Sequence, residues 1–193
     1  FPRCYESVLE DMDARDTLVS NSAYPDFSRR SKPEVKANAL KDAKSGAYVE
    51  FPATALFRNY NQKTRIVWMY PMATNIVEGS YCQPLKEAIM SSDLSFFAPW
   101  RGYEHVLARI TCHYESGEFL SASDFSHTDA HFIKGRMYEV FDVIKYAFQE
   151  KYWTGLRESL LHVCKIPLII GPNTWITGDH GVAAGSISTN DVE

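Results

Sequence analysis

Residues 121–132 read Ser-Ala-Ser-Asp-Phe-Ser-His-Thr-Asp-Ala-His-Phe, and their pattern changes from that of a strand to that of a helix. We expect a short strand over 118–125, with Asp124 at its end, and a long helix over 129–149 that begins at Asp129. A carboxylate at a strand end is fixed in position and can reach solvent in a cleft. Two such groups could hold Mg²⁺, and the backbone carbonyl of Phe125 could supply another oxygen.

The same stretch allows plainer interpretations. An Asp-x-x-x-x-Asp spacing is common, and Asp129 could be only an N-cap while Asp124 is a turn residue. On an extended strand, His127, Asp129 and His131 would share a face and could bind zinc or another transition metal. A helix that starts at Asp129 would remove that shared face.

A second stretch, residues 63–71, reads Lys-Thr-Arg-Ile-Val-Trp-Met-Tyr-Pro, and its β-branched and aromatic residues predict a strand over 64–70. Lys63 and Arg65 alternate along it, so both side chains point the same way. They could meet the phosphates of a nucleotide, since an arginine can bind two oxygens at once. The alternative is an ordinary solvated strand edge.

A third stretch, residues 181–190, reads Gly-Val-Ala-Ala-Gly-Ser-Ile-Ser-Thr-Asn. Its small residues would allow a backbone to approach a ligand closely, and a helix that opens at Ser186 would present amides that suit an anion. The alternative is a flexible linker followed by a serine cap.

The remaining patterns predict a mixed α+β chain with few strands and long helices. The apolar stripe that defines the expected helix over 129–149 consists of Ile133, Met137, Val140, Phe141, Ile144, Ala147 and Phe148. We also expect a loop over 21–33, helices over 33–44, after Pro84, over 103–113 and over 153–163, and a hairpin of 166–170 with 174–177.

The composition is that of an ordinary globular chain. Of the 193 residues, 45% are apolar and 23% are charged, which excludes a wholly disordered, collagen-like or coiled-coil chain. The net charge of -4 does not favour a general nucleic-acid binder, although it says little about a single cleft. Four widely spaced cysteines predict reduced, mostly buried thiols and no zinc site. No leader and no bilayer-length apolar run is visible, and we expect a fragment cut at both ends.

In their order and wording, the three stretches resemble motifs of the RNA-directed RNA polymerases of double-stranded RNA viruses. The resemblance is closest to the picobirnavirus group and next to the partitiviruses. Residues 63–71 resemble the basic fingers motif F, residues 124–132 resemble palm motif A, and residues 181–190 resemble palm motif B. The resemblance implies a partial right-hand polymerase, truncated before motif C and the thumb. It would comprise a fingers segment over 1–62, fingers with motif F over 63–117, and a partial palm over 118–193.

The resemblance also implies roles for individual residues. Asp124, with the Phe125 carbonyl, would bind a catalytic Mg²⁺ or Mn²⁺, and Asp129 would recognise the ribose 2′-hydroxyl. Lys63 and Arg65 would contact the incoming triphosphate. The motif B residues that would handle nucleotide and template are Gly185, Ser186, Thr189 and Asn190. The implied partners are template RNA, nascent RNA and nucleoside triphosphates, with the viral capsid protein as a further candidate and no membrane. The implied location is the host cytoplasm or the virion interior.

Three departures from the family pattern qualify these roles. Ala184 stands where the family usually has serine, and Glu193 stands where many single-stranded RNA virus relatives have asparagine. The Gly-Asp-Asp of motif C does not follow motif B, and Gly-Asp-His at 178–180 precedes motif B. We therefore expect a parent polymerase that copies viral RNA by two-metal nucleotidyl transfer, and no activity from this chain alone.

Two other functions remain open on the sequence. Asp124, His127, Asp129 and His131 could form a metal-dependent phosphoesterase. Alternatively, the chain could be an RNA-binding or structural fragment without catalysis, in which the acidic residues only cap helices.

Overall fold

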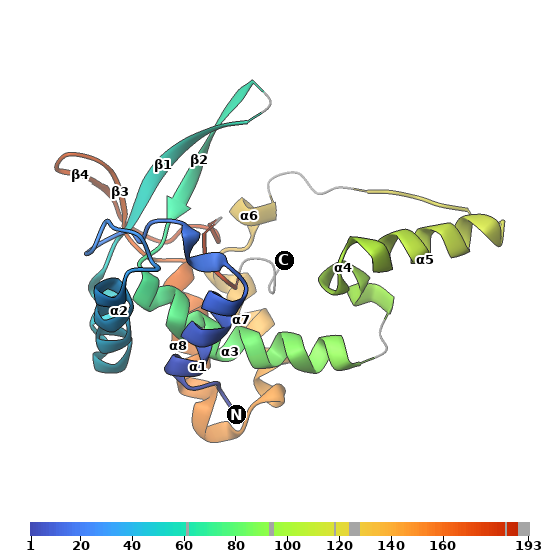
Figure 1. Ribbon diagram of the computed structural model, residues 1–193, viewed down its shortest axis with the longest axis horizontal. Helices are drawn as coiled ribbons and strands as arrows, with labels where there is room; N and C mark the ends of the chain where they lie inside the picture. Colours follow the sequence, from blue (N-terminus) through green and yellow to red (C-terminus); the bar gives the residue numbers. More distant parts are fainter. Residues whose placement is uncertain (61, 93–94, 118, 124–127, 184, 189–193) are drawn as a thin grey trace.

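The computed structural model describes residues 1–60, 62–92, 95–117, 119–123, 128–183 and 185–188. Most of its helices gather around one central helix. The helix over 103–115 and a long two-stranded hairpin extend away from this group (Figure 1). The helices are α1 Tyr5–Ala14, α2 Pro33–Ser45, α3 Met72–Ser91, α4 Ala98–Arg101, α5 Tyr103–Glu115, α6 Thr128–His131, α7 Lys134–Ile144 and α8 Trp153–Val163. The strands are β1 Ala53–Tyr60, β2 Lys63–Met69, β3 Leu168–Gly171 and β4 Thr174–Ile176.

The strands form one sheet in the order β2-β1-β3-β4. β1 pairs antiparallel with β2 from Thr54 to Tyr60, with Arg58 opposite Arg65. β1 also pairs parallel with β3, but only at its first residues, Ala53 and Thr54. The far end of the β1–β2 hairpin therefore extends beyond the rest of the sheet (Figure 1).

The central helix is α3, whose first half is buried on nearly every side. One apolar cluster joins it to α1 and α2 through residues such as Val8, Val35 and Ile76. A second cluster packs α7 against α8 around Met137 and Leu156, and a third lies at the base of the sheet. A helix buried all round shows no single apolar stripe in its sequence.

Several predicted elements are confirmed. α2 begins at Pro33 and is terminated by Gly46, which has the left-handed φ of 79° that glycine adopts without strain. β2, α5 and α8 lie within two residues of their expected bounds, and β3 and β4 form the expected hairpin. The loop over 21–33 is also confirmed, and all four cysteines are free, although only Cys82 and Cys164 are buried.

Other predicted elements were wrong. No strand forms over residues 119–123, the described part of the expected strand at 118–125. The expected helix over 129–149 is divided, because the chain between α6 and α7 turns to bond elsewhere: the Phe132 carbonyl accepts from the Val182 amide at 3.2 Å. Within the divided stripe, Ile133 is exposed whereas Met137 is buried.

Three further differences concern helices. α3 begins at Met72 and includes Pro84, where the sequence predicted a helix only after that proline. Its first half carries small and polar residues without an apolar stripe at helical spacing. The sequence pattern therefore did not predict a helix there. No helix forms over residues 186–188, the described part of the helix expected from Ser186, and α1 and β1 were not predicted. No helix in the described ranges is long and apolar enough to cross a membrane.

His162 in α8 makes the stability of the fold depend on pH. Its side chain is buried, with its ring edge-on to that of Tyr48 at 5.6 Å between centroids. Burial, and secondarily the positive charge of Lys165, lowers the pKa of His162 from its usual 6.5 to about 4. Between these values the unfolded chain holds a proton that the folded chain does not, so acid favours unfolding.

We therefore expect the free energy of unfolding to fall as pH drops from 6.5 towards 4, by about 3 kcal/mol from this group alone. Urea denaturation across this pH range would measure it. His162→Phe should remove this part of the slope, whereas His105→Gln, at an exposed position of α5, should leave it unchanged. An identical slope in the His162→Phe variant would contradict the assignment.

Candidate functional site

The loop over 178–188 brings the three singled-out stretches together at the level of the backbone. Gly185 has φ 138°, and a Cβ added to it would overlap the carbonyl oxygen of Trp68 in β2 and lie 3.1 Å from the carbonyl carbon. A Cβ on Gly181 would overlap the carbonyl oxygen of Asp129 and lie 2.8 Å from the Cα of Ala130. The two glycines therefore allow the third stretch to touch both of the others.

Further contacts hold this loop in place. The Val182 amide donates to the Phe132 carbonyl, so the loop is bonded to the chain just after α6. The ring of His180 lies 4.6 Å from that of Trp68 between centroids, and its Nε2 lies 3.0 Å from the Ile166 carbonyl oxygen. The loop is thus attached to β2, to the end of α6 and to the segment before β3.

The β1–β2 hairpin carries the predicted cations. Lys63 and Arg65 are exposed and share one face of β2, as their alternation predicted. Arg58 of β1 lies directly opposite Arg65, so it joins the same face. Like charges in facing positions oppose pairing, and a bound polyanion would relieve that repulsion. The sequence analysis missed Arg58 because β1 itself was not predicted.

Asp129 lies in the first turn of α6, and its carboxylate is exposed to solvent. Its Oδ1 accepts a hydrogen bond from the Ala130 amide at 2.9 Å. His131 stands two residues later in the same helix, where side chains do not face each other. The strand geometry that a His-Asp-His metal site required is therefore not formed over 128–131.

Several predicted site residues lie outside the described residues: Asp124, Phe125, Thr189 and Asn190, together with His127, Ala184 and Glu193 of the alternatives and departures. Within the described ranges, no group of three or more His, Cys, Asp or Glu side chains could hold a metal ion. Metal binding by Asp124 and Phe125 therefore stays a prediction.

Ser186 is held within the chain. Its hydroxyl donates to Oε1 of Glu78 in α3 at 2.9 Å, and the neighbouring Ile187 amide donates to Oε2 at 2.7 Å. Asn75 of the same helix donates to the Gly185 carbonyl at 3.1 Å. Neither Asn75 nor Glu78 was singled out in the sequence, because nothing in the local pattern shows that a buried helix faces this loop.

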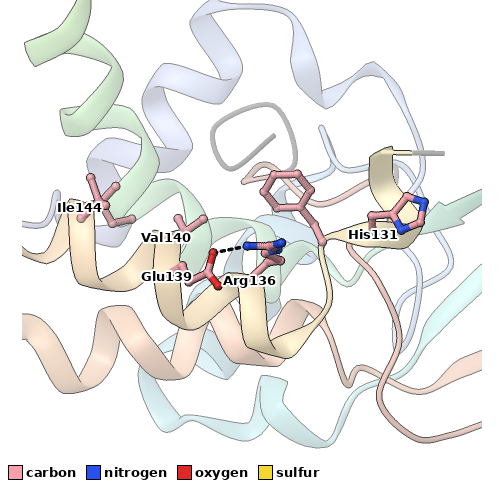
Figure 2. Close-up of a pocket in the computed structure, with 7 residues that line it drawn as sticks. His131, Arg136, Glu139, Val140 and Ile144 are labelled. Carbon is pink, nitrogen blue, oxygen red and sulfur yellow. Dashed lines mark hydrogen bonds and ion pairs between the residues drawn. The ribbon is translucent and has the colours of Figure 1, made fainter. Parts of the chain in front are cut away.

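Two hollows flank these elements. An open, largely apolar groove of about 530 Å³ runs along α7. Figure 2 shows residues of its lining, among which the Arg136 and Glu139 side chains form an ion pair. Its lining includes His131 but not Asp129, Lys63 or Arg65. A smaller cavity of about 230 Å³ is lined by Gly185 and Ile187 of the loop and by the cationic residues Arg15, Arg30 and Lys86. Of these two hollows, the smaller one adjoins the third stretch.

The close approach at Gly185 can be tested by comparing alanine substitutions at two glycines of the same loop. Gly185 and Gly178 both have positive φ, but a Cβ on Gly178 would meet nothing within 4 Å. Alanine at Gly178 should cost about 1–3 kcal/mol from backbone strain alone, and alanine at Gly185 about 1–3 kcal/mol more from overlap with Trp68. Urea denaturation would measure both. Equal losses would contradict the contact.

Comparisons with known proteins identify a family and similar folds. A sequence model described as "Viral RNA-dependent RNA polymerase" matches residues 43–192. The solved structures with similar folds include two RNA-dependent RNA polymerases of a human picobirnavirus. The insertion loop deletion mutant has a TM-score of 0.75 and 21% sequence identity, over 100% of this chain and 41% of that chain. The second, without that deletion, has a TM-score of 0.69 and 19% identity, over 100% and 44%.

No curated protein sequence matches the chain. The chain spans less than half the length of the two picobirnavirus polymerases, and the likeness to them shows a shared fold. The predicted α+β fold of a partial right-hand polymerase is confirmed by these matches. Since the family's sequence model covers most of its residues, this chain belongs to the viral RNA-dependent RNA polymerase family.

Proposed function

We propose that this chain is the fingers and part of the palm of an RNA-directed RNA polymerase that copies viral RNA by two-metal nucleotidyl transfer. The observation that supports this most directly is the loop over 178–188, where stretches resembling motifs F, A and B touch through Gly185 and Gly181. We assign 1–62 and 63–117 to the fingers, the latter with motif F, and 118–193 to the partial palm.

The cationic face of the β1–β2 hairpin is the proposed contact for the incoming triphosphate. Lys63 and Arg65 are exposed on one face of β2, and Arg58 adds a third positive charge to it. Positive groups held by a paired strand can stabilise the charge that develops during phosphoryl transfer without reorganising. Arg58 therefore extends the pair of residues that the sequence indicated.

The remaining roles belong to residues of the stretches that resemble motifs A and B. Four of these residues, Asp124, Phe125, Thr189 and Asn190, lie outside the described residues. Asp124 and the Phe125 carbonyl would hold Mg²⁺ or Mn²⁺; such ions, when bound, activate the primer hydroxyl and stabilise the leaving pyrophosphate. Asp129 would recognise the ribose 2′-hydroxyl, a role that its exposed carboxylate permits. The nucleotide-handling residues of the loop would be Gly185, Ser186, Thr189 and Asn190. Ser186 would contribute through its place in the loop, because its hydroxyl is bonded to Glu78.

The partners follow from this activity. Template RNA, nascent RNA and nucleoside triphosphates are its substrates, and the viral capsid protein is a further candidate. We propose the host cytoplasm or the virion interior as the place of action. Because this sequence holds no Gly-Asp-Asp after residues 181–190, the chain alone lacks the second set of metal-binding carboxylates, and we propose that it is inactive by itself.

Asp124→Ala in the longer polymerase should abolish templated nucleotide incorporation, because the proposed metal loses a ligand, and should leave RNA affinity unchanged. Primer extension with labelled nucleotides and RNA binding by filter retention would measure both. Asp142→Ala, at an exposed position of α7, is the matched control. Normal extension by the Asp124 variant, or sustained extension by the 193-residue chain alone, would contradict the proposal; RNA binding without extension by the unsubstituted polymerase would favour a non-catalytic role.

Arg65→Ala should raise the KM for nucleoside triphosphates roughly ten- to hundredfold, which corresponds to the loss of a charge-assisted hydrogen bond of about 1.5–3 kcal/mol. Steady-state extension at varied nucleotide concentration would measure it. Thr64→Val keeps a β-branched residue on the opposite face of β2 and should leave KM unchanged. Equal effects of the two substitutions would show that the cationic face does not meet the triphosphate.

A further inference from the structure

Glu78 is a carboxylate in the middle of α3 with only 2% of its surface exposed. Burying a carboxylate costs several kcal/mol unless hydrogen bonds and opposite charge compensate for the lost water. Its Oε1 accepts from the Ser186 hydroxyl, and its Oε2 accepts from the Ile187 amide at 2.7 Å and from Asn75 Nδ2 at 3.4 Å. Two of these three donors belong to the loop over 178–188.

Asn75, one turn before Glu78, extends the attachment. It is 1% exposed, and its Nδ2 donates to the Gly185 carbonyl while its Oδ1 accepts from Arg30 Nη2 at 3.0 Å. Arg30 also donates to the Tyr70 carbonyl at 3.1 Å. Burial lowers the pKa of Arg30, and the negative charge of Glu78 opposes that shift. The buried carboxylate thus has a cation close enough to offset part of its desolvation.

The Ser186 hydroxyl is used entirely within the chain. It donates to Glu78, accepts from the Ser188 amide at 3.1 Å, and lies 2.7 Å from the Ser188 hydroxyl. Its single proton and both acceptor positions therefore have partners. Ser186 acts here as the link through which Glu78 holds the turn over 186–188, with its side chain directed into the protein.

The same helix determines the position of the cationic strand. α3 begins at Met72, directly after β2 and the connection through Tyr70 and Pro71. The carbonyl of Trp68 in β2 touches Gly185, and Arg30 bonds to the carbonyl of Tyr70. α3 is therefore joined to the end of β2 through Arg30, which bonds to both Asn75 and Tyr70. The same helix is joined to residues 185–187 through Asn75 and Glu78.

We propose that Glu78 is a positioning residue of the nucleotide site: its buried carboxylate fixes residues 185–188 relative to the cationic hairpin. This inference rests on the proposed function, since the positioned elements are those that would meet the incoming nucleotide. Glu78 itself touches no substrate and acts through Ser186 and Ile187.

The attachment can be tested in the 193-residue chain without any activity. Glu78→Gln keeps the side-chain size, but an amide offers one acceptor oxygen where the carboxylate offers two. Hydrogen exchange should become at least tenfold faster at the amides of Ile187 and Ser188. Glu87→Gln changes an exposed carboxylate of the same helix, which pairs with Arg3, and should leave both rates unchanged. Unchanged rates in a folded Glu78→Gln protein would overturn the inference.

Ser186→Ala supplies a second variant that removes one hydroxyl and leaves Glu78 bonded to Ile187 and Asn75. Exchange should accelerate at least tenfold at the Ser188 amide, which loses its acceptor, while the Ile187 amide keeps its protection. This result would support the inference even if Glu78→Gln fails to fold. Equal acceleration at both amides, or none at either, would overturn it.

In the longer polymerase, Glu78→Gln should raise the KM for nucleoside triphosphates three- to tenfold and change kcat less than twofold. A purely structural role would instead lower the fraction of folded enzyme, which reduces the apparent kcat and leaves KM unchanged. That second pattern would overturn the positioning role. Absence of extension by the unsubstituted polymerase would overturn the proposed function, while the exchange rates would still decide whether Glu78 holds the loop.

Discussion

The carbonyl oxygen of Trp68 lies where a side chain on Gly185 would have to be, and the arrangement of this protein depends on that contact. Through this contact the loop over 178–188 lies directly against β2. At Gly181, nearer the start of the loop, its backbone lies directly against that of Asp129. Close approach of two backbones requires residues without a Cβ, so the glycines of the third stretch are structural necessities. The three stretches meet because this loop reaches both neighbours.

The polar residues beside this loop differ in burial: those of α3 are buried, and those of the hairpin are exposed. On the inner side, Asn75 and Glu78 are buried and their hydrogen-bonding atoms are directed at the loop and at Arg30. On the hairpin, Arg58, Lys63 and Arg65 are exposed and crowd one face. A buried network of this kind gives the loop a fixed base. The exposed cationic face of β2 is suited to a phosphate-bearing partner.

Elements whose signals lie in their own residues could be predicted from the sequence, and elements that depend on distant contacts could not. Gly46 terminates α2, and the β-branched and aromatic run of β2 forms the expected strand, because each signal lies within the element itself. The expected helix over 129–149 was divided because the Phe132 carbonyl bonds to Val182, far along the chain. α3 was recognised only in part, since a helix buried on all sides has no stripe to reveal it.

The sequence alone determined the identities and order of the three stretches, the alternation of Lys63 and Arg65, and through them the resemblance to viral RNA polymerases that the family match confirms. Each of these properties depends on residues that are close together in the sequence, so residue types and their spacing are enough to show it. Only the tertiary structure decided that Arg58 faces Arg65, that Gly185 lies against Trp68, and that Glu78 bonds to Ser186. Each of these contacts joins residues from separate elements, and no local pattern specifies which elements will meet when the chain folds.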